Sequence, residues 1–339
     1  QSPDCTGSSI ADLTRRVWYE PRRATRRARR PRSEAMTVER EDDGRAARSA
    51  KATRRDTRTA AERRRGNSIP PARTARAPLT ASTADKHDLY QRAVQNPEEE
   101  AKFVAQTFRE LRGREATTLR EDFCGTAAFS ASWVRLAPAS NRATGLDVDR
   151  AVLAWGRAHN VVPLGELADR VTLLEQDVRE TTPPEFDVVA AFNFSYWIFK
   201  TRRALAEYFT AVHASLRRDG AFFLDAYGGW EAHEPMTERR AIDGKFTYIW
   251  DQSSVNPIDN GIVNHIHFRF RDGTELQRAF TYDWRLWSLA EIRELLLECG
   301  FATVTVYWDV AEDGDEEDYQ PRARADNQPG WLAYIVACK

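Results

Sequence analysis

The stretch Arg120-Glu121-Asp122-Phe123-Cys124-Gly125-Thr126-Ala127 decides the predicted fold. It lies between a short strand predicted at Thr117–Glu121 and a helix predicted at about Ala127–Leu136. Gly125 in this turn lets the backbone approach a ligand closely, because glycine has no Cβ. The first N–H groups of the helix have no partner within the helix and would face the same ligand. We therefore expect a binding site where this strand ends.

Strands and helices alternate along the chain around this turn. Helices are predicted between Asn96 and Gly113, over Arg150–His159, and along the apolar face from Leu205 to Leu216. This alternation predicts a parallel sheet covered by helices on both faces, which is an α/β fold. The further apolar strands are predicted at Ala143–Leu146, Val171–Glu175, Phe186–Phe192 and Gly220–Leu224.

Two helices have capping signals in the sequence. Asn96 is predicted to cap a helix with Pro97 at its first position, and Gly113 ends that helix. Ser288 and Glu291 form a capping box that opens another helix near the C-terminus.

Residues 229–287 break the alternation and predict a β-meander inserted after the fifth strand. Asn260-Gly261 and Asp272-Gly273 are strong signals for its hairpin turns. We expect this insertion to cover the substrate as a lid. Its strands are predicted at Phe246–Trp250, Ile262–Phe270 and Glu275–Tyr282.

Polar residues follow the other strands of the predicted sheet as well. Asp147 ends the second strand, where an acidic residue can accept two hydrogen bonds from a ribose diol. Asp177 ends the third strand, in reach of an adenine amine, and the fourth ends at Asn193. Ligands of open α/β sheets bind at the carboxyl ends of the strands, so these side chains are expected to share one site.

Over residues 85–339 the chain resembles the class I S-adenosylmethionine-dependent methyltransferases. Their first motif reads acidic-x-Gly-x-Gly-x-Gly, and here Phe123 and Ala127 occupy the first and third glycine positions. The resemblance implies a Rossmann-like, mostly parallel sheet that ends in an antiparallel hairpin of Phe301–Trp308 and Trp331–Ala337. It also implies a methyltransferase domain at 81–339 with S-adenosylmethionine as its cofactor.

The resemblance also implies roles for single residues in the donor site. Glu121 would contact the methionine ammonium, Asp147 the ribose hydroxyls and Asp177 the adenine amine, with Val178 against the adenine ring. The full set of donor residues implied in this way is Glu121, Gly125, Thr126, Asp147, Val148, Asp177, Val178 and Asn193.

The acceptor is expected beside the end of the fourth strand. Methyl transfer is an in-line displacement, so Asn193 and Tyr196 are predicted to position the acceptor, and a base is needed only if it still carries a proton. Asn193-Phe194-Ser195-Tyr196 is similar to the Asn-Pro-Pro-Tyr motif of nucleic-acid methyltransferases but lacks both prolines. Aromatic residues would line the acceptor pocket, and the predicted substrate contacts are Tyr90, Trp197, Tyr227 and Trp250.

Other residues near the site have more than one interpretation. Arg120 could pair with the donor carboxylate or with Asp122 at the surface. Cys124 is expected to be a small packing residue. His265 and His267 lie on one strand face, which we expect to be solvated rather than to bind a metal ion.

Charge is divided unevenly along the 339 residues. Residues 1–80 carry 21 Lys and Arg against 10 Asp and Glu, whereas residues 81–339 carry 29 against 41. The first segment has few large apolar residues, so we expect it to be disordered, without a specific function. The acidic remainder would repel a phosphate backbone, so we expect a small-molecule acceptor and a nucleic acid only through the basic arm.

The composition also limits location. No apolar run is long enough to span a membrane, and the four widely spaced cysteines favour a reducing cytoplasm. The oligomeric state stays open.

Three other functions remain open on this sequence. The chain could be a nucleic-acid or protein methyltransferase that recruits its substrate through the basic arm, or a binding protein that kept the fold without catalysis. A nicotinamide-dependent oxidoreductase would normally show Gly-x-Gly-x-x-Gly after the first strand, and only Gly125 is present there.

Overall fold

The computed structural model describes residues 79–183, 185–311 and 317–339. The basic arm predicted at 1–80 lies outside the described residues, apart from Leu79 and Thr80.

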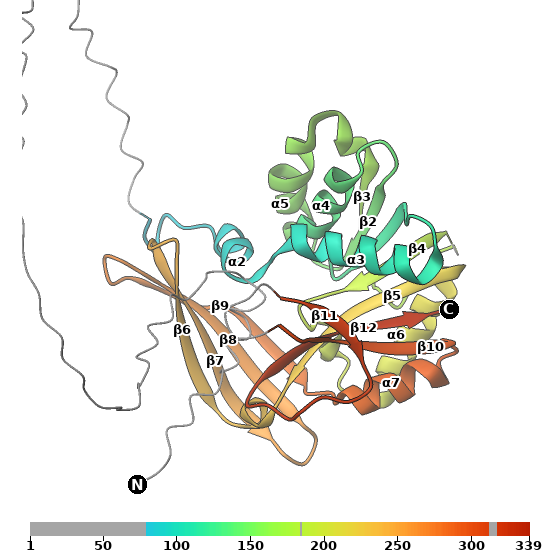
Figure 1. Cartoon of the computed structure of the whole chain (residues 1–339). Coiled ribbons are helices and arrows are strands. Elements are labelled where there is room, and N and C mark those ends of the chain that lie inside the picture. Colours follow the sequence, from blue (N-terminus) through green and yellow to red (C-terminus); the bar gives the residue numbers. More distant parts are fainter. Residues whose placement is uncertain (1–78, 184, 312–316) are drawn as a thin grey trace, which may run out of the picture. The chain divides into compact units, whose positions relative to one another are not determined.

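The main sheet has eight strands in the order β11-β10-β12-β5-β4-β1-β2-β3 (Figure 1). Strands β1 to β5 pair in parallel, and β12 pairs antiparallel with both β5 and β10, which confirms the predicted sheet and its final hairpin. Strand β11 was not predicted. The bounds are β1 Thr118–Asp122, β2 Arg142–Asp147, β3 Val171–Glu175, β4 Phe186–Ala191, β5 Leu216–Gly228, β10 Thr303–Asp309, β11 Tyr319–Arg322 and β12 Trp331–Cys338.

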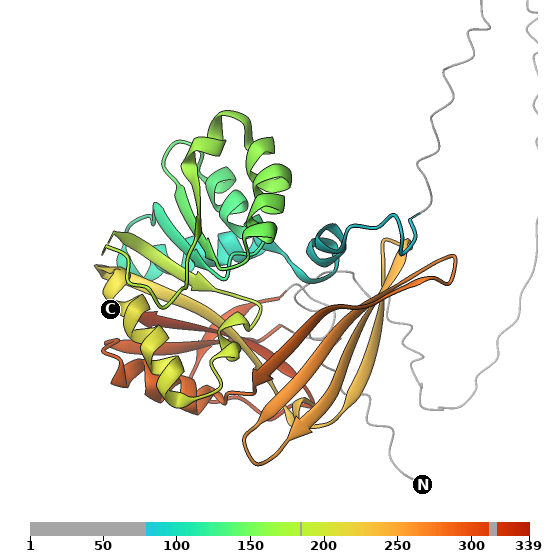
Figure 2. The same ribbon diagram turned by 180° about the vertical axis from the view of Figure 1, so that it is seen from behind.

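Helices cover both faces of this sheet. Helices α3 (Pro97–Arg112), α4 (Ala128–Leu136) and α5 (Arg150–Gly156) lie on one face, and α6 (Arg202–Ser215) and α7 (Leu289–Glu298) lie on the other (Figures 1 and 2). Side chains of β4 and β5 alternate between the two cores, because successive residues of a strand point to opposite faces. All six residues of β4 are therefore buried.

The helix ends agree with the capping signals in two of three places. Ser288 and Glu291 form the predicted capping box, and Gly113 ends α3 with φ 67°. Asn96 is the N-cap residue of α3 and Pro97 its first residue, as predicted, but the Asn96 side chain does not make the expected capping hydrogen bond. The helix predicted at Arg150–His159 ends earlier, and a π-helical turn at Arg157–Val161 follows it.

A second sheet of four antiparallel strands lies between β5 and α7 in the sequence, in the order β6-β7-β8-β9. The predicted meander lacked β6, whose buried residues include the charged Glu238 and Arg240. Charged residues on the inner face hide the apolar alternation that marks a strand. The bounds are β6 Met236–Ile242, β7 Phe246–Asn256, β8 Gly261–Phe270 and β9 Glu275–Arg285.

Helix α2 (Lys86–Val94) connects the two sheets through polar contacts. Gln91 donates a hydrogen bond to Thr126 after β1, at 2.7 Å. Arg92 pairs with Asp243 in the β6–β7 turn at 2.8 Å. A search of the described residues finds no helix with the length and apolar character needed to cross a membrane.

Candidate donor and acceptor site

The turn after β1 has an unusual backbone. Phe123, Gly125 and Ala127 have φ angles of 55°, 50° and 57°, which lie in the left-handed region. A residue with a Cβ adopts this region at a cost of roughly 1–2 kcal/mol. The turn therefore keeps the conformation that glycine would favour at all three positions, although only one glycine is present. Backbone strain of this kind gathers at functional sites.

Asp147 at the end of β2 ties this turn to the neighbouring strand. Its Oδ2 accepts the N–H of Gly125 at 2.8 Å, and its Oδ1 accepts the N–H of Asp149 at 2.9 Å. A carboxylate has lone pairs for further bonds, so both oxygens can still accept hydrogen bonds from a diol. Next to Asp147, the Val148 side chain is 69% exposed. The Asp147 carboxylate could bind the hydroxyls of a ribose, and the exposed Val148 side chain could pack against a flat ring attached to that ribose.

Thr126 is held by residues that the sequence reasoning missed. Its hydroxyl accepts the Gln91 amide from α2, and its C=O accepts the Asn160 amide at 2.8 Å. Gly156 on α5 allows this packing, because a Cβ there would lie 2.4 Å from the Thr126 oxygen. Gln91 and Asn160 lie 35 and 34 residues from Thr126 along the chain, so no local pattern in the sequence predicts either contact.

Two tightly packed residues lie beneath the turn. Cys124 is buried against Gly145, where a Cβ would lie 2.8 Å from the Cys124 Sγ. Burial raises the pKa of the Cys124 thiol well above its usual value, as expected for a packing residue. Glu121 is also buried and accepts the Ser130 N–H at 2.8 Å and the Ser130 hydroxyl at 2.5 Å.

The Glu121 carboxyl is poised near neutral pH. Burial raises its pKa to about 8 against the lowering effect of the Ser130 hydrogen bonds, and the charges of Asp147 and Asp122 raise it further. A bound cation would favour the ionised form of this carboxyl.

At the end of β3, Asp177 is paired rather than free. The Arg179 guanidinium lies 2.6 Å from its Oδ2, and these hydrogen bonds lower the Asp177 pKa. Val178 beside it is buried, and its C=O accepts a hydrogen bond from Arg120 at 2.6 Å. An adenine amine and Arg179 would both donate hydrogen bonds to the Asp177 carboxylate.

Arg120 pairs with Asp122 at 2.6 Å, and Asp122 was one of its two predicted partners. The surface location was wrong, because both side chains are fully buried. The remaining Arg120 donors reach Val178, Thr182 and Ser215. The Arg120 guanidinium thus joins β1 to the segment after β3 and to the end of α6 in the protein interior.

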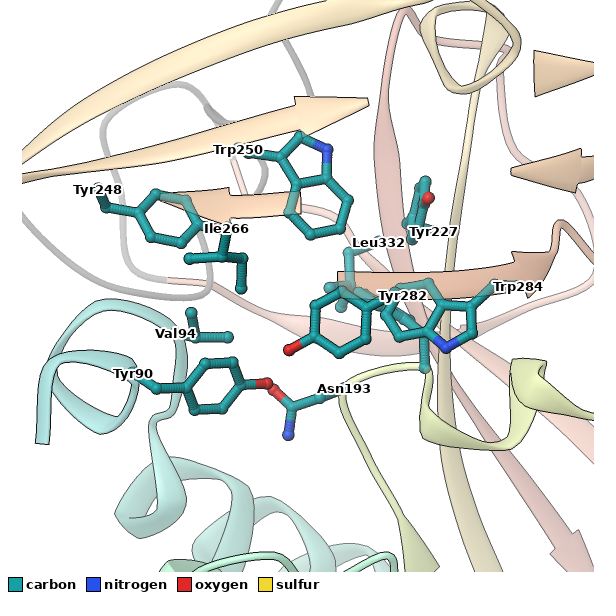
Figure 3. Close-up of a pocket in the computed structure, with 11 residues that line it drawn as sticks. Tyr90, Val94, Asn193, Tyr227, Tyr248, Trp250, Ile266, Tyr282, Trp284 and Leu332 are labelled. Carbon is teal, nitrogen blue, oxygen red and sulfur yellow. The ribbon is translucent and has the colours of Figure 1, made fainter. Parts of the chain in front are cut away.

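A second part of the site is an aromatic cavity between the β4 end of the main sheet, helix α2 and one face of the second sheet. Figure 3 shows the Tyr90 and Tyr282 hydroxyls and the Asn193 amide pointing toward a common space. The Tyr90 and Tyr282 hydroxyls interact with each other there. The lining consists of Tyr90, Val94, Asn193, Phe194, Tyr227, Tyr248, Trp250, Ile266, Tyr282, Trp284 and Leu332.

Asp225 on β5 fixes the turn that carries Asn193, and the sequence reasoning missed it. Its carboxylate accepts the N–H groups of Asn193 and Phe194 at 2.8 and 2.9 Å, and both of these residues have φ 58°. Burial raises the Asp225 pKa to about 7, although the two N–H groups lower it. An acidic residue within an otherwise apolar strand was the available signal.

The structure brings most of the predicted acceptor residues together. Asn193, Tyr90, Tyr227 and Trp250 all line the aromatic cavity. Tyr196 is fully buried instead, and its hydroxyl donates to the Asp225 C=O at 2.8 Å. Trp197 is also fully buried and packs on Tyr227, with 4.8 Å between ring centroids.

The histidine pair on β8 is less exposed than expected. His265 is buried, and its Nδ1 lies 2.9 Å from the Thr281 hydroxyl. His267 lies 3.5 Å from the Asp251 carboxylate. Within the described ranges, no group of three or more His, Cys, Asp and Glu side chains could hold a metal ion.

Comparison with solved structures identifies the fold. An S-adenosylmethionine-dependent methyltransferase from Clostridium acetobutylicum aligns with a TM-score of 0.55 at 16% identity, over 74% of this chain and 96% of its own. The amino pentose methyltransferase CalS10 from Micromonospora echinaspora gives 0.55 at 16%, over 74% and 95%. The sugar N-methyltransferase KedS8 from a Streptoalloteichus species gives 0.54 at 16%, over 87% and 99%.

The chain thus has the Rossmann-like fold of class I S-adenosylmethionine-dependent methyltransferases. No protein-family model matches the sequence, and a search of curated proteins finds no match either.

Proposed function

We propose that this chain is an S-adenosylmethionine-dependent methyltransferase that methylates a small molecule held in the aromatic cavity. One observation carries the proposal: three left-handed residues, Phe123, Gly125 and Ala127, lie beside Asp147 at the carboxyl ends of β1 and β2. The chain order of the sheet reverses between β1 and β4, which is where open α/β sheets bind their ligands. A strained turn at this point needs a function that maintains it.

The residues present fit the donor. Asp147 would accept the ribose hydroxyls, and Val148 and Val178 would lie against the adenine. Asp177 would accept a hydrogen bond from the adenine amine while it remains paired with Arg179. At the methionine end, the backbone of Gly125 and Thr126 would contact the donor, and Glu121 would lie near its ammonium group. When bound, the donor supplies the methyl group.

The cavity favours an acceptor with an amine. Aromatic faces attract cations, and the described part of the cavity carries phenols and one amide but no charged side chain. CalS10 and KedS8, which share the fold, are named as methyltransferases of an amino pentose and a sugar nitrogen. Methyl transfer by in-line displacement needs donor and acceptor in line, so the chain's contribution is mainly to orient them. Asn193 would orient the acceptor, with Tyr90, Tyr227 and Trp250 around it.

Tyr196 and Trp197 would support the residues that line this cavity without contacting the acceptor. The Tyr196 hydroxyl holds the Asp225 C=O, and Asp225 holds the Asn193 backbone, so Tyr196 would position Asn193. The second sheet, within 229–287, would form the lid of the acceptor. A cytoplasmic location remains a prediction.

Calorimetric titration of the full chain with S-adenosylmethionine and S-adenosylhomocysteine tests the donor site, with NAD as the control ligand. We expect micromolar binding of the first two and none of NAD. Asp147→Ala should abolish binding, whereas Asp149→Ala should keep it, because Asp149 only caps α5 through the N–H groups of Ala151 and Val152. If neither donor compound binds, the chain is a binding protein with this fold and the proposal fails.

A further inference from the structure

A second cavity lies between helix α3 and the strands β10, β11 and β12. Among the described residues, it shares no lining residue with the aromatic cavity described above. Aromatic rings form one part of its wall, and acidic side chains of α3 form another, with Lys102 as the one basic residue in the described lining. Neither the donor site nor the acceptor site uses these residues.

The rings of this second cavity are grouped around Phe103. Its ring stacks on Tyr334, with centroids 4.5 Å apart, and meets Tyr307 and Tyr319 edge-on at 5.6 and 6.0 Å. Tyr319 and Tyr334 also contact each other at 4.7 Å. Grouped ring faces present negative electrostatic potential to a ligand, which favours a cation.

Glu100 is the most buried carboxylate of the wall. It lies in the first turn of α3 with a relative exposure of only 6%. Among the described residues, its side chain makes no hydrogen bond and no ion pair. Its acidic neighbours differ, because Glu99 pairs with Lys102 at 2.7 Å and Glu110 accepts from Gln106 at 2.9 Å. The Glu100 carboxyl is therefore available to a ligand that enters the cavity.

Two other acidic groups, on β5 and β1, act on Glu100. Burial raises the Glu100 pKa well above its usual value, and the charges of Asp225 on β5 and Glu121 on β1 raise it further. The phenols of Tyr334 and Tyr90 are in turn influenced by Glu100. Among the described residues, the charges found to act on Glu100 come from carboxyl groups, so a ligand with a positive charge would favour its ionised form.

We propose that this second cavity binds a protonated primary or secondary amine attached to an apolar group. The ammonium donates a hydrogen bond to Glu100, and the apolar group packs against Phe103 and Tyr334. Because the rings and the carboxyl lie outside the donor and acceptor residues, this binding does not depend on the proposed methyl transfer.

Calorimetric titration of the full chain with benzylamine tests the proposal, and benzyl alcohol is the neutral control of nearly the same shape. We expect benzylamine to bind at least tenfold more tightly than the alcohol. Glu100→Gln keeps the side-chain volume and should remove that preference. The matched control is Glu98→Gln, an exposed residue in the same turn of α3 that is not among the described lining residues, and it should leave benzylamine affinity within about twofold.

Proton release gives a second readout that a merely structural role of Glu100 would not produce. Burial raises the Glu100 pKa and a bound ammonium would lower it, so amine binding should release a proton from Glu100 over the pH range between the two values. Titrations in two buffers with different ionisation enthalpies measure this release, which should vanish in Glu100→Gln. Phe103→Leu should weaken benzylamine without abolishing the release.

Three results would overturn the proposal. These are equal affinity for amine and alcohol, unchanged binding in Glu100→Gln, or displacement of benzylamine by S-adenosylhomocysteine, which would place the amine in the donor site. Failure of S-adenosylmethionine to bind would leave the benzylamine result intact, so the two proposals fail separately.

Discussion

Asp147 accepts the backbone N–H of Gly125 at 2.8 Å, and this hydrogen bond joins the end of β2 to the strained turn after β1. A Cβ at Gly125 would have Val152 as its only close neighbour, at 3.8 Å, so it would project into the space beside the turn. Gly125→Ala should therefore cost only about 1–2 kcal/mol of stability, from the left-handed backbone. We expect donor affinity, measured by calorimetry, to fall at least tenfold.

Gly113→Ala is the matched control for that variant. Gly113 ends α3 with φ 67°, and a Cβ there would meet nothing within 4 Å. Its stability loss should be similar to that of Gly125→Ala, with donor affinity unchanged. Equal donor affinity in both variants would show that no ligand lies against the turn.

The turn also shows what the sequence could and could not predict. Alternating strands and helices, the Ser288 capping box and the order of acidic strand ends follow from local patterns, and the structure confirms each of these elements. Gln91 and Asp225 were missed, because each acts through a partner far away in the chain. Strand β6 was missed because its inner face is charged.

The buried pair of Arg120 and Asp122 predicts a large effect on stability. Asp122→Asn leaves the guanidinium buried without its counter-charge, and removing one partner of a buried pair costs about 3–5 kcal/mol. Asp177→Asn breaks the exposed pair with Arg179 and should cost about 1 kcal/mol or less. Chemical denaturation of both variants measures the difference, and equal losses would contradict the buried role of Arg120.

Stability should fall as pH rises from 5 to 9. In the folded chain, the Glu121 pKa is about 8 and the Asp225 pKa is about 7, whereas carboxyl groups of the unfolded chain have a pKa of about 4. Between these values the folded state holds more protons than the unfolded state, so each group lowers the free energy of unfolding by up to about 1.4 kcal/mol per pH unit.

Glu121→Gln tests this dependence, because it should flatten the fall of the unfolding free energy between pH 5 and pH 8. Asp187 does not interfere. Burial alone would raise its pKa, but hydrogen bonds from Thr117, Thr118 and Arg114 lower it to about 2, so its contribution is lost only below this range. A slope unchanged by Glu121→Gln would mean that this carboxyl is ionised throughout.

The two phenols Tyr282 and Tyr196 separate acceptor binding from support of the fold. The Tyr282 hydroxyl points into the aromatic cavity (Figure 3), so Tyr282→Phe should raise KM for an amine acceptor severalfold with donor affinity unchanged. Tyr196→Phe removes the hydrogen bond to the Asp225 C=O and should cost about 1 kcal/mol of stability. Steady-state kinetics with the first acceptor from an amine screen measures both. A larger effect on KM from Tyr196→Phe than from Tyr282→Phe would move the acceptor to Tyr196.

Deleting residues 1–78 tests whether the basic arm recruits the substrate. The catalytic part is acidic, with 29 Lys and Arg against 41 Asp and Glu in residues 81–339, so a phosphate backbone would bind only through the arm. If the acceptor is a small molecule held by the aromatic cavity, the truncated chain should keep donor affinity and kcat/KM within about twofold. A nucleic-acid or protein methyltransferase would instead lose most of its kcat/KM while its donor affinity stayed the same. Adding salt sharpens the test, because recruitment by the arm weakens steeply with ionic strength, whereas binding in an apolar cavity does not.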